Sequence, residues 1–156
     1  MKRLFFFAPI FLLASCFHES RKRKDPPVPN ENHLLTGCYY ITDDSSGVKR
    51  NLINSTDIYF LNPSPIFHVG NFREAKFISD EQTCMNINLF PESSKAFAEA
   101  TGNHIGQQFA FVIDDTLIMV PKVMSKIENG QITIAGNFSR KEIMYYVEKI
   151  DKEMYE

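Results

Sequence analysis

Apolar and polar side chains alternate in the second half of the chain in patterns that predict first a strand and then a helix. Residues 84–90 alternate with period two, as the residues of a half-buried strand do. Between residues 92 and 105 the period lengthens to that of a helix with one apolar face, and Gly106 is its predicted C-terminal stop. The predicted face consists of Phe97, Ala100, Thr101, His104 and Ile105.

Three more strands are predicted after Gly106. Residues 109–113 and 117–120 are apolar runs that meet at Asp114-Asp115, so they predict a hairpin with an acidic turn. Residues 131–134 follow Asn129-Gly130, a pair that tolerates the positive φ of a tight turn.

The first half of the folded part is predicted to consist mainly of strands. Residues 37–41, 58–61 and 75–79 are β-prone, and residues 66–69, bounded by prolines, predict a short or edge strand. Residues 42–55 are polar and include a turn, and no strand is predicted there.

A final helix begins at a capping box formed by Ser139 and Glu142. Ile143, Val147 and Ile150 form its predicted apolar stripe. The order of elements indicates the α+β class, with a mostly antiparallel sheet and two helices packed on one face.

The N-terminus has the features of an export signal. Lys2 and Arg3 precede an apolar run of eleven residues, which is too short for a membrane span of about twenty. The tetrad that ends in Cys16 resembles a bacterial lipobox, so residues 1–16 are interpreted as a lipoprotein signal and Cys16 as the acylated residue, palmitate being one such chain. Because Phe17 follows the cysteine, the resemblance implies a lipid-anchored protein of the outer membrane that faces the periplasm.

Residues 17–36 are predicted to form a flexible tether, and residues 37–156 a single domain. The basic run 21–24 has two interpretations: attraction to anionic headgroups, or a solvated linker. The predicted domain holds eleven Lys and Arg against sixteen Asp and Glu, so nucleic acid is not an expected partner.

Fourteen phenylalanines and six tyrosines belong mainly to the core in our interpretation. Adjacent tyrosines are different, because in an adjacent pair one ring is expected to face outward. An outward tyrosine suits a protein interface. The candidate partner-binding residues are Tyr39, Tyr40, Tyr145 and Tyr146.

Cys38 and Cys84 are the two cysteines of the predicted domain. Both lie at starts of predicted strands, which would be neighbours if the two residues formed a disulfide. The equally weighted alternative is a pair of reduced cysteines.

Catalytic and metal-binding signatures are missing from the sequence. The histidines are scattered, no HExxH or nucleotide-binding motif occurs, and adjacent acids such as Asp114-Asp115 fit turns better than acid–base catalysis. We therefore expect no catalytic residue, no metal, no cofactor and no enzymatic activity.

A family resemblance lies in the same stretch that carries the clearest periodicity. Its residues are Leu89, Glu92, Lys95, Phe97, Ala98, Glu99 and Thr101, followed in order by Ile105-Gly106, Ala110, Val112, Asp114, Pro121, Val123, Ile127, Gly130 and residues 136–139. Over residues 57–147 the chain resembles the head of the first periplasmic domain (P1) of SecDF, the membrane subunit that assists protein export. Pro91, Ser93 and Asp115 depart from the family pattern, and the family's transmembrane segments are not in this sequence.

The resemblance implies a non-enzymatic module that binds a polypeptide or protein and is linked to protein export. The lipobox-like N-terminus adds the expectation that a lipid holds this module to a membrane. Two alternatives stay open: a structural lipoprotein with one dedicated protein partner, and an inhibitor or immunity-type lipoprotein.

Overall fold

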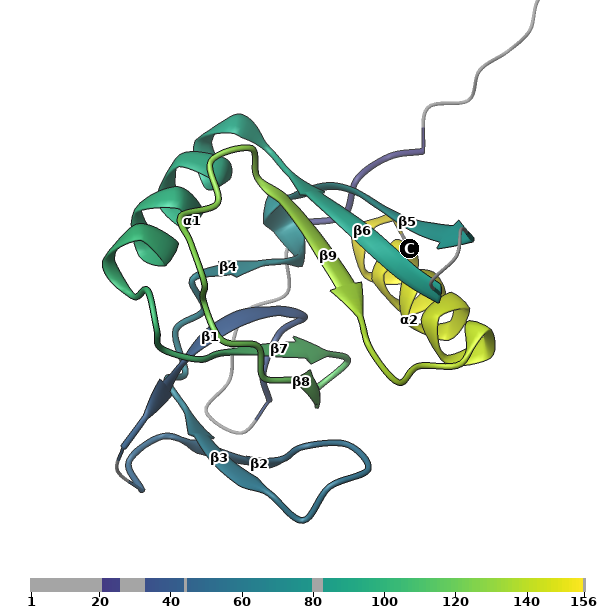
Figure 1. Cartoon of the computed structure of the whole chain (residues 1–156). Coiled ribbons are helices and arrows are strands. Elements are labelled where there is room, and N and C mark those ends of the chain that lie inside the picture. Colours follow the sequence, from purple (N-terminus) through teal and green to yellow (C-terminus); the bar gives the residue numbers. More distant parts are fainter. Residues whose placement is uncertain (1–20, 26–32, 44, 80–82, 156) are drawn as a thin grey trace, which may run out of the picture.

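The computed structural model describes residues 21–25, 33–43, 45–79 and 83–155 (Figure 1). The elements of this part of the chain are β1 (Gly37–Thr42), β2 (Val48–Asn51), β3 (Ile58–Leu61), β4 (Phe67–His68), the 3-10 turn η1 (Val69–Asn71), β5 (Phe72–Ser79), β6 (Thr83–Leu89), α1 (Pro91–Asn103), β7 (Phe109–Ile113), β8 (Thr116–Met119), β9 (Gln131–Ala135) and α2 (Arg140–Tyr155).

The strands form two sheets. The larger has the order β2-β3-β1-β7-β8, with β4 also paired to β1, and the smaller has the order β5-β6-β9. All pairs of named strands are antiparallel. The predicted α+β class is thus confirmed, and the structure adds that the strands divide into two sheets.

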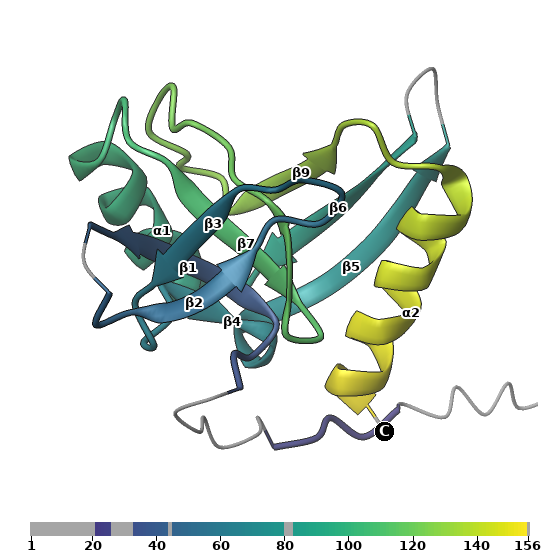
Figure 2. The same ribbon diagram turned by 90° about the horizontal axis from the view of Figure 1, so that it is seen from below.

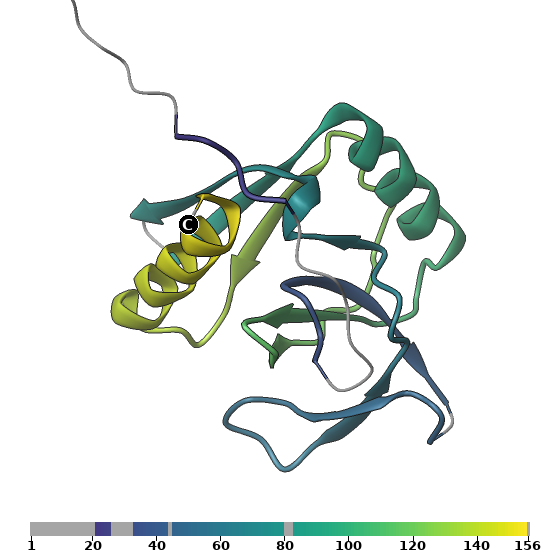
Figure 3. The same ribbon diagram turned by 180° about the vertical axis from the view of Figure 1, so that it is seen from behind.

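The two helices contribute to one core. α2 packs along β5 and β6, on the side of the small sheet that Figure 3 shows in front. α1 follows β6 directly and lies toward the opposite end of the molecule (Figure 2). Phe97 and Ala100 of α1 belong to the same buried cluster as Ile143 and Ile150 of α2.

Most predicted strands are present within one or two residues of their expected bounds. β7 has the predicted limits, β8 is shifted by one residue toward the N-terminus, and β9 extends one residue further than predicted. β2 was not predicted. Its sequence, VKRN, has one apolar side chain, and the strand forms because all four residues pair with β3.

The first helix is shorter than predicted. α1 ends at Asn103, so Ile105 lies beyond it and is 59% exposed instead of facing the core. The predicted face is confirmed at Phe97, Ala100 and Thr101, which are all buried. Gly106 has φ +88° in the turn that follows.

The capping box of the last helix is confirmed. The Glu142 N–H donates to Ser139 Oγ at 3.2 Å, and the Ser139 N–H donates to the Glu142 carboxylate at 2.7 Å. The buried stripe of α2 contains Ile143 and Ile150 as predicted, with Tyr146 buried between them and Val147 only partly buried.

The folded part begins earlier than residue 37. Leu34, Leu35 and Thr36 are all at most 4% exposed, so the predicted end of the tether at residue 36 is wrong. Thr36 is held at both sides: its hydroxyl donates to Glu153 at 2.6 Å and accepts from the Asp114 N–H at 2.9 Å. The predicted signal, residues 1–16, lies outside the described residues.

Candidate functional site

The outer edge of β9 carries main-chain groups without a strand partner among the described residues. β9 pairs with β6 and ends the order of the small sheet. The Leu89 N–H donates to the Gly130 carbonyl at 2.9 Å, and in an antiparallel ladder every second residue pair is joined in this way. Ile132 and Ile134 therefore bond to β6, whereas the N–H and C=O of Thr133 point to the open edge.

The opposite edge of the same sheet is protected. β5 carries Arg73 and Lys76, and a register shift interrupts its pairing near the start. Arg23 donates to the Arg73 carbonyl at 2.9 Å. Charges and bulges discourage the addition of another strand. β9 has no charged residue, so within the small sheet it is the edge to which a strand can be added.

An apolar groove runs along the open edge of β9. It encloses about 260 Å³ and is walled by α1, β7, β8 and residues 121–127. Small-molecule pockets usually enclose about 300–1,000 Å³, so the groove is better matched to a few side chains of an extended segment. Its apolar lining includes Phe97, Phe111, Met119, Met124, Ile127 and Ile134.

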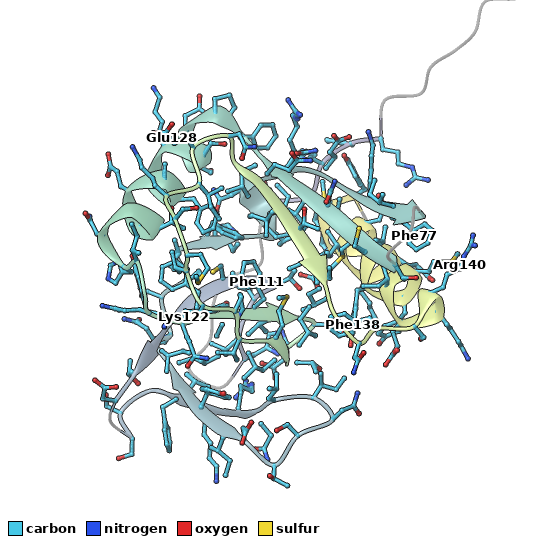
Figure 4. The ribbon with its side chains drawn as sticks, viewed as in Figure 1. Phe77, Phe111, Lys122, Glu128, Phe138 and Arg140 are labelled. Atoms are coloured by element: carbon cyan, nitrogen blue, oxygen red, sulfur yellow. The ribbon has the colours of Figure 1, made fainter. Side chains whose placement is uncertain are left out.

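A second hollow continues the groove along β8 and β9. It encloses about 410 Å³, shares Met119 with the first, and reaches past Ala135 to Phe138. Figure 4 shows Phe111 and Lys122 on one side of β9 and Phe138 beyond its C-terminal end. Together the two hollows follow β9 along its length.

Hydrogen bonds hold the segment 121–127 in place. The Gly106 N–H donates to the Val123 carbonyl at 2.8 Å. The Ile127 N–H donates to the Thr101 hydroxyl at 3.0 Å. This wall of the groove is therefore formed without any partner, and Met124 lies in it with 78% of its surface exposed.

The four tyrosines predicted to bind a partner do not form one surface. Tyr39 is fully buried and donates to the Leu35 carbonyl at 2.7 Å, and burial raises its pKa. Tyr146 is 4% exposed. Tyr40 on β1 is partly buried and Tyr145 on α2 is 50% exposed. Of the four rings only that of Tyr145 faces outward, because Tyr40 packs against the core beside His104 and Phe109. The prediction is wrong for Tyr39 and Tyr146, because their rings belong to the core.

The two cysteines are free and far apart in the topology. Cys38 lies in β1, between β4 and β7, and Cys84 lies in β6, between β5 and β9. A disulfide would have required neighbouring strands, whereas these two strands belong to different sheets. Cys38 is fully buried, and this burial raises the pKa of its thiol. Cys16, the predicted lipidation site, lies outside the described residues.

The acidic pair forms the turn between β7 and β8, as predicted. Asp114 and Asp115 have φ of +48° and +61°. Asp115 accepts from the Leu34 N–H at 2.8 Å and forms an ion pair with Arg50. Burial acts to raise the pKa of Asp115, but these hydrogen bonds and the guanidinium charge hold that pKa below its usual value. The Asp115 carboxylate thus has a structural role, because it connects β2, the β7–β8 turn and the N-terminal arm.

The described part of the chain contains neither a metal-binding cluster nor a membrane-spanning helix. No group of three or more His, Cys, Asp or Glu side chains there could hold a metal ion. None of the helices described is long and apolar enough to cross a bilayer. His104, placed on the predicted helix face, has Nδ1 2.8 Å from the Ala100 carbonyl oxygen.

Sequence reasoning missed the groove. The signal that could have suggested it is the uncharged alternation of residues 131–135, in contrast to the charged residues 73–76. That contrast identifies an edge only when the strand order is known, and strand order is not a local property of the sequence.

The fold and the groove together define a small α+β domain organised around one open strand edge. A family model described as "SecDF, P1 head subdomain" matches residues 45–144. The chain therefore belongs to the SecDF P1 head family. The match excludes residues 21–25 and most of α2, both of which the structure describes.

Curated relatives agree with this assignment. The chain is 37% identical over 62 residues to protein translocase subunit SecD of Aquifex aeolicus, covering 39% of this chain and 12% of that protein. It is 28% identical over 75 residues to SecD of Magnetococcus marinus, covering 48% of this chain and 14% of that protein. The chain thus corresponds to a small part of these SecD proteins.

Solved SecDF structures have a similar fold. A structure described as "a membrane component SecDF that enhances protein export" has a TM-score of 0.59 at 19% identity, covering 77% of this chain and 63% of the other. SecDF in a "super-membrane-facing form" has a TM-score of 0.53 at 25% identity, covering 58% of this chain and 12% of the other.

Proposed function

We propose that this chain is a polypeptide-binding module of the bacterial cell envelope, linked to protein export, and that it binds an extended segment of an exported chain along β9. The observation that carries the proposal is the uncharged, open edge of β9 beside an apolar groove. Membership of the SecDF P1 head family supports the link to export, because the relatives are protein translocase subunits. The proposed activity is binding, with no catalytic step.

Main-chain hydrogen bonds between β9 and the bound segment would provide affinity, and the groove would receive side chains of that segment. An added strand would pair with the outward N–H and C=O of Thr133, and with the equivalent groups two residues away in either direction. Alternate side chains of the added strand would enter the groove, where Met119, Met124 and Ile127 offer adaptable apolar contact. Main-chain pairing does not depend on sequence, so the module would accept many exported chains.

The proposed location follows from the N-terminal sequence. Acylation at Cys16 would hold the chain to a membrane, and Phe17 favours the outer membrane, with the domain in the periplasm. Cys16→Ala should move the protein from the membrane fraction to the soluble fraction. Retention of this variant in the membrane fraction would contradict the anchor.

Photo-crosslinking in intact envelopes tests the proposal. A photoreactive residue replaces Met124 in the groove wall or, as the control, Ile58 on β3, which is also exposed but lines neither hollow along β9. We expect many unrelated exported chains to be crosslinked from position 124 and few from position 58. One dominant partner would instead indicate a dedicated interaction, and equal yields at the two positions would exclude the groove.

A proline at the open edge separates strand addition from general apolar contact. Thr133→Pro removes an outward N–H and leaves the bonds of Ile132 and Ile134 to β6 in place. Thr133→Ala is the matched control, because it also loses the side-chain bond to Asn86 but keeps the N–H. The ligand is a reduced, carboxymethylated and therefore unfolded polypeptide. Thr133→Pro should bind it at least fivefold more weakly than the unmodified protein does, and Thr133→Ala should not. Equal affinities for folded forms of both variants would exclude pairing at this edge.

A further inference from the structure

The basic run of residues 21–24, which precedes the domain, contacts the folded part through both its main chain and its side chains. The Lys24 N–H donates to the Met154 carbonyl at 3.0 Å, near the end of α2. Arg21 forms an ion pair of 2.5 Å with Asp151, one turn earlier in the helix. Neither predicted interpretation, a headgroup-binding run or a solvated linker, describes these contacts.

Arg23 makes the most specific contacts of the run. Its Nη2 donates to the carbonyls of Phe72 and Arg73, at the start of β5. Its guanidinium also lies 4.7 Å from the centroid of the Phe90 ring and 5.6 Å from that of Tyr155. A planar, forked cation that bonds two carbonyls and stacks on aromatic rings is not replaceable by an ammonium group.

The arm is attached a second time after residue 32. Leu34 is buried, and its N–H donates to Asp115 at 2.8 Å. The Thr36 hydroxyl donates to Glu153 on α2 at 2.6 Å. The N-terminal arm therefore meets the domain both before and after residues 26–32.

The arm and the groove lie on opposite sides of the domain. Residues 21–25 pass in front of the domain in Figure 3, whereas β9 and the 121–130 segment are in front in Figure 1, which is the reverse view. Figure 2 agrees, with the arm at one side of the molecule and β9 at the other.

We infer that residues 21–25 are a strap that fixes the N-terminal arm to the end of α2 and the start of β5, and so presents the β9 groove away from the point of membrane attachment. The docking of the strap stands on the contacts alone, and the orientation rests on the proposed lipid anchor. From Cys16 to Arg21 the chain reaches at most about 18 Å when fully extended. An anchored domain would thus be held close to the bilayer, with its groove open to the periplasm.

Limited trypsin digestion of the full-length protein tests the strap. Arg23→Lys keeps the charge and the cleavage site but loses the fork, so cleavage within residues 21–24 should become at least tenfold faster. Lys22→Arg is the matched control, because Lys22 is exposed, and its cleavage rate should not change. Cleavage of the unmodified protein as fast as that of a free peptide of the same sequence would overturn the strap.

Depth-dependent quenching tests the orientation without any polypeptide substrate, so its outcome is independent of whether β9 binds one. A fluorophore is placed at position 22 or at position 124 of the lipidated protein in vesicles that carry headgroup spin labels. We expect quenching at least threefold stronger at position 22, with a smaller difference in the Arg23→Lys background. Equal quenching at the two positions would overturn the orientation.

Discussion

At the scale of residues, the carboxylates near the N-terminal arm have opposite electrostatic environments. Asp115 lies against Arg50 and the Leu34 N–H, and its pKa is lowered despite partial burial. Glu153 accepts one hydrogen bond from Thr36, and burial raises its pKa. Asp114 adds to this rise, while Lys149 and His33 oppose it without cancelling it. One carboxylate therefore stabilises the fold as an ion, and the other does so better when it is uncharged.

Glu153→Gln should be at least as stable as the unmodified protein at pH 7. The amide keeps an acceptor for the Thr36 hydroxyl and removes the cost of a partly buried charge. The gain should be small, at most roughly 1 kcal/mol, because solvent screens a partly exposed charge. Urea unfolding gives the free energy for both proteins.

The pH dependence of Glu153 has a definite sign. Its folded pKa lies above the unfolded value of 4.5, so the native state binds a proton first as the pH falls. Its contribution to the unfolding free energy therefore increases from neutral pH down to the unfolded pKa, and the glutamine variant should lack this increase. If Glu153→Gln lowered the unfolding free energy at pH 7 by more than about 1 kcal/mol, the conclusion that the Glu153 charge is destabilising would be contradicted. Glu148→Gln, in an exposed pair with Lys152, is the control.

At the scale of elements, the turn before β9 packs closely against the first turn of α1. Gly130 has φ +63°, and a Cβ at this position would lie 1.9 Å from Ser94 Oγ and 3.3 Å from Ser94 Cα. The Ser94 hydroxyl and N–H both bond to the Phe90 carbonyl, so the side chain is not free to move aside. The close approach fixes where β9 begins relative to α1, and so fixes one end of the groove.

Gly130→Ala should destabilise the protein by at least about 3 kcal/mol, because left-handed strain of about 1–2 kcal/mol adds to the overlap with Ser94. Gly106→Ala is the matched control: its φ is +88°, and nothing lies within 4 Å of its Cβ position. Gly106→Ala should be destabilised only by the left-handed strain of about 1–2 kcal/mol. Equal losses in chemical unfolding would mean that the contact with Ser94 carries no energy.

At the scale of the whole molecule, the division into two sheets decides which side chains meet. β1 lies inside the larger sheet and β6 inside the smaller one, so Cys38 and Cys84 have different neighbours. Within the described residues, the same division leaves β9 without a second strand partner and places β8 across the groove from it. The open edge is thus a property of the complete topology.

Both cysteines of the domain should be free thiols with different accessibility. In the native, unreduced protein Cys84, which is partly exposed, should be alkylated first, and Cys38 should react only as the protein unfolds. Alkylation followed by peptide mass spectrometry separates the two positions from Cys16. A peptide that links Cys38 to Cys84 in an unreduced digest would contradict the sheet assignment.

Elements whose signals are local could be predicted from the amino-acid sequence alone. The Ser139–Glu142 capping box, the Asp114-Asp115 turn and the strand of residues 109–113 are all found where they were predicted. Each depends on residues within a few positions of one another. The family resemblance was also readable, because it rests on the order of residues along the chain.

Strand order, and with it the location of the site, depends on tertiary contacts that no local pattern in the sequence shows. β2 exists because it pairs with β3, and Tyr146 rather than Val147 is buried because of where α2 meets the sheet. The strap contacts join residues far apart in the sequence: Arg23 and Phe72 are 49 positions apart, and Arg21 and Asp151 are 130 apart. A local pattern shows which residues share a face, but not which element covers that face, and the function proposed for this protein depends on the outer edge of β9, which has no strand partner among the described residues.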